Sequence, residues 1–534
     1  MCKLLLSFYI VNYYLQFDRN NGLPVPSQRA AIIGAGIGGL AAAIDLAVQG
    51  IDVTLIERAD GPGGKLRGVG VGGQRLDAGP TVLTMKSVFD ELFNDAGASL
   101  DEHLRLLPLA ILARHAWSED ERLDLFANTE QSAHSIGDFA GAAEAKRFLE
   151  FCTRSREIFK TLDAVFMRTQ RPSPLSLVIA AAPQGLGKLW NISPFTTMWQ
   201  ALGRYFHDPR LRQLFGRYAT YCGSSPFASP ATLMLVAHAE QMGVWTIEGG
   251  MFRLAEAMAN LATARGVSIL YNTDVTEVTV AQGRARGVRL ADDEHIFADA
   301  VICNADIGAL SAGLLGAKAE SVAPKMRVEA RSLSAVTWVL RASAQGFPLH
   351  RHNVFFSGDY PTEFNDIAGR KRLPTDPTVY VCAQDRSDDR RAPAGPERLL
   401  LLVNAPPTGD RDSFDISEIE QCSETTFRKL RSCGLHLSPK EVKVTTPADF
   451  NRMYPGTGGA LYGRASHGWM ASFQRPAARS KLPGLYLAGG STHPGPGMPM
   501  AAISGRLAAQ CVIADLSSSG PSRATAMLGG TSTR

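Results

Sequence analysis

A glycine pattern near the beginning of the chain constrains the fold more than any other feature. Gly34-Ala35-Gly36-Ile37-Gly38-Gly39 satisfies G-x-G-x-x-G and follows the apolar run Ala30–Ile33, which predicts a buried parallel strand. A pattern rich in alanine and leucine predicts a helix over Gly38–Gln49, and Asp52–Ile56 predicts a second strand. Together these elements form a β-α-β unit, so the chain is expected to contain an α/β domain with a parallel sheet.

The glycine spacing suits a dinucleotide-binding, Rossmann-type unit. The first glycine permits the tight turn, the second lets a pyrophosphate approach the backbone, and the third lets helix and strand pack closely. N–H groups at the beginning of the helix would face the phosphates. Glu57 follows the second strand, where a carboxylate would accept hydrogen bonds from the ribose hydroxyls of an adenosine. The alternatives are a plain glycine-rich turn and a solvent-exposed glutamate.

Three further segments extend the pattern. In Glu57-Arg58-x-x-x-x-Gly63-Gly64-Lys65 a second glycine pair suits a loop that folds back across the pyrophosphate, with Lys65 or Arg67 supplying positive charge. Asp77-Ala78-Gly79-Pro80-Thr81 follows it. Near the other end, the apolar run Leu485–Ala488 predicts a strand that leads into Gly489-Gly490, and a helix beginning near Met498 would direct its positive end toward a bound anion.

These residues resemble the signature of FAD enzymes of the amine oxidase and carotenoid desaturase superfamily. The chain is most similar to the bacterial phytoene desaturase family, and the resemblance extends from about residue 28 to 516. Internal landmarks that match are Tyr221-x-Gly223, Gly243-Val244-Trp245, Glu248-Gly249-Gly250-Met251 and Asn304-Ala305-Asp306. The resemblance implies an FAD-binding Rossmann-type domain formed by both chain ends, with an α+β substrate domain and a helical membrane-associating region inserted. It also implies that Val275 presents its backbone to the adenine ring.

The resulting expectations can be stated residue by residue. The predicted FAD-binding residues are Gly34, Gly36, Gly38, Gly39, Glu57, Arg58, Gly63, Gly64, Lys65, Gly79, Pro80, Thr81, Val275, Gly489, Gly490 and Met498. The predicted regions are an N-terminal extension (1–29), a first FAD-binding part (30–136), a helical substrate and membrane-associating region (137–243), a second FAD-binding part (244–310), a substrate domain (311–480), a third FAD-binding part (481–516) and a disordered tail (517–534).

The C-terminal motif narrows the expected activity. Gly497-Met498-Pro499-Met500-Ala501-Ala502 is similar to the branch of the family that introduces 3,4 double bonds into 1-hydroxycarotenoids such as 1-hydroxyneurosporene. The resemblance leaves open a phytoene desaturase, a carotenoid isomerase or ketolase, a flavin amine oxidase and a non-enzymatic isoprenoid carrier.

No catalytic base is predicted. Some relatives carry an Asp and an Arg before an A-A-P-Q segment, whereas Leu177 and Ala180 stand there in this chain. His238 and Glu240, or the cluster Tyr462, Arg464, Ser466 and His467, are candidates for holding the substrate hydroxyl.

Composition bears on partners and location. The 534 residues carry a net charge of +4, which is too mild to indicate nucleic acid, and the histidines show no metal-ligand spacing. The scattered cysteines suggest reduced thiols and hence the cytoplasm. The apolar segment Pro172–Gly187 is followed by Lys188 and Trp190, and the preceding Lys146–Arg171 is rich in basic residues. We therefore expect peripheral docking on the inner, photosynthetic membrane, with an acyclic carotenoid as substrate and quinone or oxygen as electron acceptor.

Overall fold

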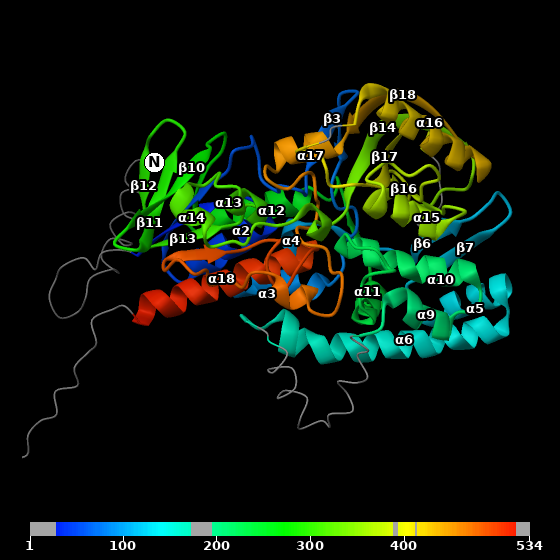
Figure 1. Ribbon diagram of the computed structural model, residues 1–534, viewed down its shortest axis with the longest axis horizontal. Coiled ribbons are helices and arrows are strands. Elements are labelled where there is room, and N and C mark those ends of the chain that lie inside the picture. The colour runs from blue at the N-terminus through cyan, green and yellow to red at the C-terminus, as the bar shows by residue number, and fades with distance from the viewer. Residues whose placement is uncertain (1–27, 172, 174–194, 388–392, 412–413, 519–534) are drawn as a thin grey trace, which may run out of the picture.

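The N-terminal and C-terminal segments meet in one parallel sheet. The computed structural model describes residues 28–171, 173, 195–387, 393–411 and 414–518. Its five-stranded sheet has the order β19-β13-β1-β2-β9, with every pairing parallel. The strands are β1 (Arg29–Ile33), β2 (Asp52–Ile56), β9 (Ser268–Leu270), β13 (Ala300–Cys303) and β19 (Leu485–Leu487). Because β13 lies between β1 and β19, three segments distant in sequence form one Rossmann-type sheet, as predicted. In Figure 1 the blue N-terminal part of the chain and the red C-terminal helix lie side by side.

Two long helices of this domain pack closely against each other. They are α2 (Ile37–Val48), directly after β1, and α18 (Met498–Ser518), which closes the described chain. A Cβ added to Gly505 would lie 2.0 Å from the Gly38 carbonyl oxygen, so the contact requires glycine in α18. Further helices of this part of the chain are α3 (Lys86–Asp95), α4 (Leu100–His103) and α12 (Arg253–Ala264).

A second sheet takes most of its strands from residues 311–480. Its seven strands have the order β18-β14-β17-β16-β15-β6-β7, and all pairings are antiparallel except β15 with β6. The strands are β6 (Ile111–Ala116), β7 (Arg122–Phe126), β14 (Ser334–Gly346), β15 (His352–Phe355), β16 (Val379–Ala383), β17 (Glu397–Ala405) and β18 (Leu435–Thr445). Helix α16 (Ile416–Ser432) covers one face, where the Trp338 indole donates to the Ser423 hydroxyl (3.0 Å). Strands β6 and β7 fall within residues 30–136, which the sequence assigned to FAD binding, but their pairing places them in this second sheet.

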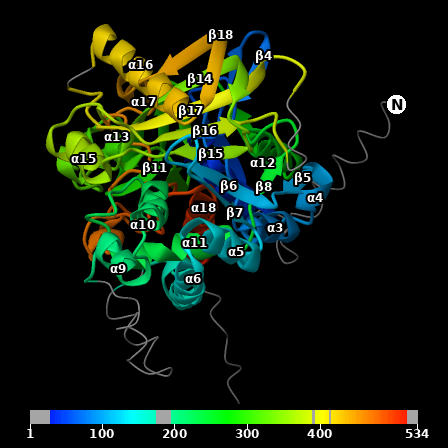
Figure 2. The same cartoon turned by 90° about the vertical axis from the view of Figure 1, so that its right-hand side faces the viewer.

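The helices between β7 and residue 244 in the chain, here called the inserted helices, lie beneath the seven-stranded sheet (Figure 2). They are α5 (Thr129–Ala140), α6 (Ala142–Leu162), η1 (Asp163–Met167), α9 (Met198–Tyr205), α10 (Pro209–Gly216), η3 (Arg217–Cys222), η4 (Ala231–Met234) and α11 (Leu235–Gln241). Stacked aromatic rings form their core, with Phe206 and Phe215 centroids 4.6 Å apart. The N-terminal extension up to residue 27, the segment 174–194 with Leu177, Ala180 and Trp190, and the tail from 519 lie outside the described residues.

Smaller elements complete the fold. The small sheets pair β3 (Gly68–Val71) with β4 (Gln74–Asp77), β5 (Leu106–Pro108) with β8 (Trp245–Ile247), and β10 (Val275–Ala281), β11 (Arg284–Leu290) and β12 (His295–Phe297) with one another. The short helices are α13 (Ile307–Ser311), α14 (Ala317–Glu320), η5 (Val328–Ala330), α15 (Tyr360–Phe364), η6 (Asn365–Gly369), α17 (Pro447–Met453) and η7 (Ala471–Gln474). Strands β9 and β10 belong to different sheets because the chain turns between them at Asn272, whose φ is 52°. Within the described ranges, no helix is both long and apolar enough to cross a bilayer.

Candidate active site

One large cavity joins the three parts of the molecule. Its volume is about 1680 Å³, above the roughly 300–1,000 Å³ typical of a site for one small ligand. Residues of the Rossmann-type domain, the inserted helices and the seven-stranded sheet all line it. Every predicted FAD-binding residue lies on its wall except Gly39. The cavity therefore has room for a dinucleotide together with a second, long molecule.

The two N-terminal glycine loops lie directly against each other. Gly36 and Gly63 form an isolated bridge, and the Gly63 N–H donates to the Ala35 carbonyl (2.9 Å). Gly63 has a φ of 118°, in the region that favours glycine, and a Cβ on Gly64 would lie 3.4 Å from the Gly36 Cα. The second loop folds back over the first, as its sequence predicts.

Asn304 holds the glycine loops in place, a role that the sequence did not reveal. Its side-chain amide donates to the Gly34 carbonyl (3.1 Å). A Cβ on Gly38 would lie 2.6 Å from its Oδ1, and a Cβ on Gly489 would lie 2.8 Å from the same atom. The side chain therefore fills the space that these glycines leave, at the junction of segments from both ends of the chain. Only its place just after a strand, before Ala305-Asp306, could have indicated this.

Backbone hydrogen bonds anchor the carboxylate of Glu57 at the cavity wall. It follows β2, is 7% exposed, and accepts hydrogen bonds from the backbone N–H groups of Ala35 (2.7 Å) and Ala59 (2.9 Å). These bonds fix its orientation at the cavity wall. Each carboxylate oxygen keeps a further lone pair with which to accept from a ribose hydroxyl.

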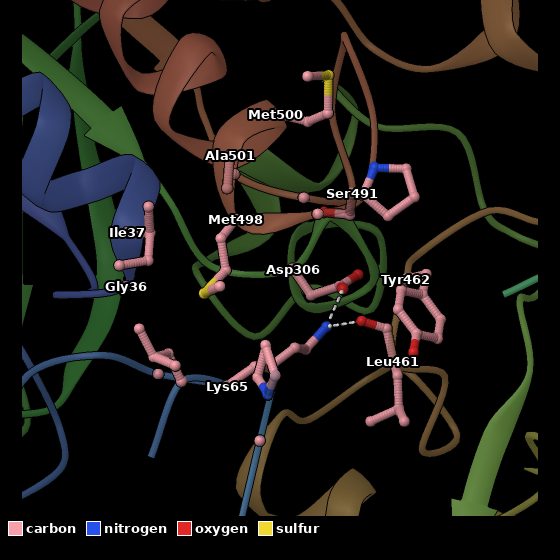
Figure 3. Close-up of a pocket in the computed structure, with 18 of the residues that line it drawn as sticks. Gly36, Ile37, Lys65, Asp306, Leu461, Tyr462, Ser491, Met498, Met500 and Ala501 are labelled. Atoms are coloured by element: carbon pink, nitrogen blue, oxygen red, sulfur yellow. Dashed lines mark hydrogen bonds and ion pairs between the residues drawn. The ribbon is translucent and has the colours of Figure 1, made fainter. Parts of the chain in front are cut away.

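The two candidate cations of the second loop differ in their surroundings. The Lys65 ammonium reaches across the cavity, 3.4 Å from the Asp306 carboxylate and 2.7 Å from the Leu461 carbonyl oxygen (Figure 3). In contrast, the buried Nη2 of Arg67 has no hydrogen-bond partner among the described residues. A free, buried donor beside the loops matches the need of an anionic or carbonyl group of a bound cofactor.

Helix α18 begins at the cavity. Gly497, Met498, Met500 and Ala501 line it, and Figure 3 shows the latter three around the same space as Lys65 and Asp306. The unpaired N–H groups of the first turn and the helix dipole place positive potential there. Pro499 lies within that first turn, where its missing N–H costs little. The positive end would stabilise negative charge on a reduced flavin.

The residues expected to hold a substrate hydroxyl separate into two groups. Tyr462 and Ser466 line the cavity, whereas His238, Arg464 and His467 do not. His467 instead accepts a hydrogen bond from the Ser225 N–H through Nε2 (3.1 Å). Glu240 lies behind the cavity wall, where it accepts from the Tyr221 hydroxyl (3.0 Å).

The cavity thus combines two interlocked glycine loops, an oriented carboxylate, an arginine with one unpaired buried nitrogen and the beginning of a helix. Such a site, continuous with space for a second ligand, defines an FAD-dependent oxidoreductase of the Rossmann type.

Comparison with known proteins gives the family. The model of the flavin containing amine oxidoreductases matches residues 37–513, and the chain belongs to this family. It is 52% identical to a hydroxyneurosporene desaturase of Rubrivivax gelatinosus, with 96% of this chain and 98% of that protein covered. A hydroxyneurosporene desaturase of Cereibacter sphaeroides is 44% identical (92% and 98% covered), and a 4,4'-diapolycopene oxygenase of a Methylomonas species is 32% identical (92% and 99% covered).

Solved structures share the fold at low sequence identity. An oxidoreductase from Methanosarcina mazei superposes with a TM-score of 0.59 at 16% identity, covering 91% of this chain and all of the other. Wild-type putrescine oxidase bound to putrescine gives a TM-score of 0.55 at 15% identity, covering 91% and 99%. The architecture is therefore that of flavin amine oxidases.

Proposed function

We propose that the chain is an FAD-dependent desaturase that introduces the C3–C4 double bond into acyclic 1-hydroxycarotenoids such as 1-hydroxyneurosporene. The observation that carries the proposal is its 52% identity to a hydroxyneurosporene desaturase over nearly the whole of both chains, against 32% for the oxygenase. A cavity that continues beyond the glycine loops into an apolar region supports it. Phe159, Leu162, Phe166, Met167 and Leu233 line that region, which suits a polyene.

In this proposal, different residues among those predicted to bind FAD hold different parts of the cofactor. The carboxylate of Glu57 holds the ribose, the two glycine loops and Arg67 hold the pyrophosphate, and the beginning of α18 faces the flavin. Lys65 keeps the second loop against Asp306 and Leu461.

The substrate loses a hydride from one carbon and a proton from its neighbour. Bound FAD supplies the hydride acceptor. Loss of hydride beside a conjugated system leaves an allylic cation, so its neighbouring proton needs no strong base, and water can accept it. The titratable side chains that line the cavity here support a reaction without a side-chain base. Burial raises the pKa of Tyr221, Tyr360 and Tyr380, and it raises the pKa of Cys222 to about 11. These groups keep their protons at neutral pH and enclose the substrate without acting as bases.

Entry of the substrate from a membrane is the second part of the proposal. Phe195 is 68% exposed and Trp469 43% exposed, their ring centroids are 5.3 Å apart, and both line the cavity. Exposed aromatic rings at a cavity opening, with Lys146, Arg156 and Lys160 exposed on α6, suit docking on an anionic lipid surface. In this proposal the protein associates peripherally with the cytoplasmic face of the inner, photosynthetic membrane and passes electrons to quinone or oxygen.

Pigment analysis tests the proposed reaction. The chain is expressed in bacteria that make neurosporene, and in bacteria that also make its 1-hydroxy derivative. We expect loss of two hydrogens and a longer-wavelength spectrum only with the hydroxylated pigment. Desaturation of neurosporene itself, a gain of oxygen, or an isomer of unchanged mass would each contradict the proposal, and a gain of oxygen would indicate the activity named for the 32% identical relative.

A further inference from the structure

A buried cation lies in the cavity wall on the substrate side. Arg217 begins η3 and lines the cavity together with Tyr221 and Tyr380. Its guanidinium carbon lies 5.3 Å from the Tyr221 ring centroid and 5.5 Å from that of Tyr380, as in cation–π contacts. Among the described residues, its side chain makes one hydrogen bond, to the Tyr221 hydroxyl (3.4 Å), and no carboxylate lies within ion-pair distance. A guanidinium has five N–H donors, so donors remain for a ligand in the cavity.

The charge of Arg217 is balanced one side chain away. The Tyr221 hydroxyl accepts from Arg217 and donates to the Glu240 carboxylate (3.0 Å), which also accepts from Tyr218. Burial raises the pKa of Glu240, whereas the two tyrosine hydroxyls and the charge of Arg217 lower it. An ionised carboxylate accepts hydrogen bonds at both oxygens, as Glu240 does from Tyr218 and Tyr221, and can thus balance the charge of Arg217. The pair is then neutral overall, which favours a neutral acceptor in the cavity over a second anion.

The position of this group matches the geometry of the substrate class. Thr81, one of the predicted FAD-binding residues, hydrogen bonds to the Tyr380 hydroxyl (2.6 Å), and Arg217 lies over the Tyr380 ring. The hydroxyl oxygen on C1 of a 1-hydroxycarotenoid lies at most about 5 Å from C4, given C–C bonds of about 1.5 Å. The hydroxyl must therefore lie about one side chain from the reacting carbons. Arg217 is likewise separated from Thr81 by one side chain, that of Tyr380.

We propose that Arg217, oriented by Tyr221 and balanced by Glu240, donates a hydrogen bond to the tertiary hydroxyl of the substrate and so selects 1-hydroxylated carotenoids. The inference rests on the proposed function. A non-hydroxylated carotenoid would leave the guanidinium donors facing hydrocarbon, and an unmet buried donor is costly. Arg217 is thus a specificity-determining residue, and Glu240 is a positioning residue.

Binding without turnover tests the subsite. The FAD-loaded enzyme is reduced under anaerobic conditions, so that it cannot desaturate, and is titrated in detergent with 1-hydroxyneurosporene or neurosporene while protein fluorescence is followed. We expect the wild type to bind the hydroxylated carotenoid about 10- to 100-fold more tightly, as for a hydrogen bond to a charged group. Arg217→Gln should reduce that ratio to about one, because it removes both the hydrogen bond to the hydroxyl and the cost of unmet donors beside neurosporene.

Three further variants keep the test decisive. Arg212→Gln, one turn earlier on α10 and outside the cavity lining, should retain the ratio because that arginine holds the Trp199 carbonyl (2.8 Å). The double variant Arg217→Gln/Glu240→Gln removes both charges together and should fold if the single variant does not. Tyr221→Phe keeps both charges and should lower the ratio by loosening Arg217.

Two results would overturn the inference. One is a ratio that survives in Arg217→Gln, or in Tyr221→Phe if neither charge variant folds. The other is a loss of FAD, or a changed flavin spectrum, at an unaltered ratio, because Arg217 would then serve the cofactor. In both cases the proposed function stands. That function fails separately if the oxidised wild type removes no hydrogen from 1-hydroxyneurosporene.

Discussion

Replacing Gly39 by alanine separates the packing of the glycine motif from direct contact with the cofactor. Gly39 does not line the cavity, yet a Cβ there would lie 2.1 Å from the Gly34 carbonyl oxygen. Carbon and oxygen approach to about 3.3 Å, so the beginning of α2 must retreat by about 1 Å. Overpacking of this kind costs about 1–3 kcal/mol. Because the displaced atoms include the N–H groups that face the phosphates, we expect the Kd for FAD to rise about 5- to 150-fold if the whole cost falls on binding.

The assay is titration of the apoprotein with FAD, followed by flavin fluorescence, together with the Tm in the presence and absence of FAD. Gly70→Ala is the matched control, because Gly70 lines the same cavity, has no positive φ, and has no atom within 4 Å of an added Cβ. Its Kd should equal that of the wild type. If Gly39→Ala binds FAD as tightly as Gly70→Ala does, the close approach of helix and strand does not set the phosphate site, and the reasoning is refuted.

Three other predictions address the remaining parts of the molecule. Asn304→Ala removes the amide that donates to a carbonyl of the first glycine loop (3.1 Å), so FAD should be retained about 10-fold less tightly on dilution; undiminished retention would argue against that role. Burial raises the pKa of Glu363 to about 7, above the 4.5 of an exposed carboxyl. The stability that this group contributes is therefore fully present below about pH 4.5 and falls by about 3 kcal/mol as the pH rises from there through about 7. Urea unfolding of Glu363→Gln should lack this decline, and parallel pH profiles would contradict it. The double variant Phe195→Ser/Trp469→Ser should partition to anionic vesicles at least 10-fold more weakly, because each buried ring contributes about 1.5–3 kcal/mol. The control is Phe297→Ser, whose ring is 65% exposed on the remote β12 and which should partition like the wild type. Equal partitioning of the two variants would contradict the proposed docking surface.

Local patterns predicted the elements that are bounded by strong signals. The predicted strands Ala30–Ile33, Asp52–Ile56 and Leu485–Ala488 agree with β1, β2 and β19 to within one residue at each end. The closing helix begins at Met498, as the sequence predicts, because proline is accepted in a first turn. In all these segments the signal lies within a few residues of the element itself.

Long-range pairing was beyond the reach of such patterns. Nothing within Ile111–Ala116 reveals that it pairs with a strand more than two hundred residues later, so the sequence grouped it with the first FAD-binding part although it joins the second sheet. In the site, the glycines were found because their spacing is fixed, whereas Asn304, Arg217 and Glu240 act through partners that only the fold brings together. Such side chains carry no motif of their own.

The most direct test of the central claim is a single anaerobic turnover. Oxidised enzyme is mixed with 1-hydroxyneurosporene while the flavin absorbance is recorded, and the molecular mass of the carotenoid is then measured by mass spectrometry. We predict bleaching of the flavin with formation of an equal amount of carotenoid two hydrogens lighter. Flavin that stays oxidised in the presence of bound 1-hydroxyneurosporene, or a carotenoid recovered with its mass unchanged, would contradict the assignment.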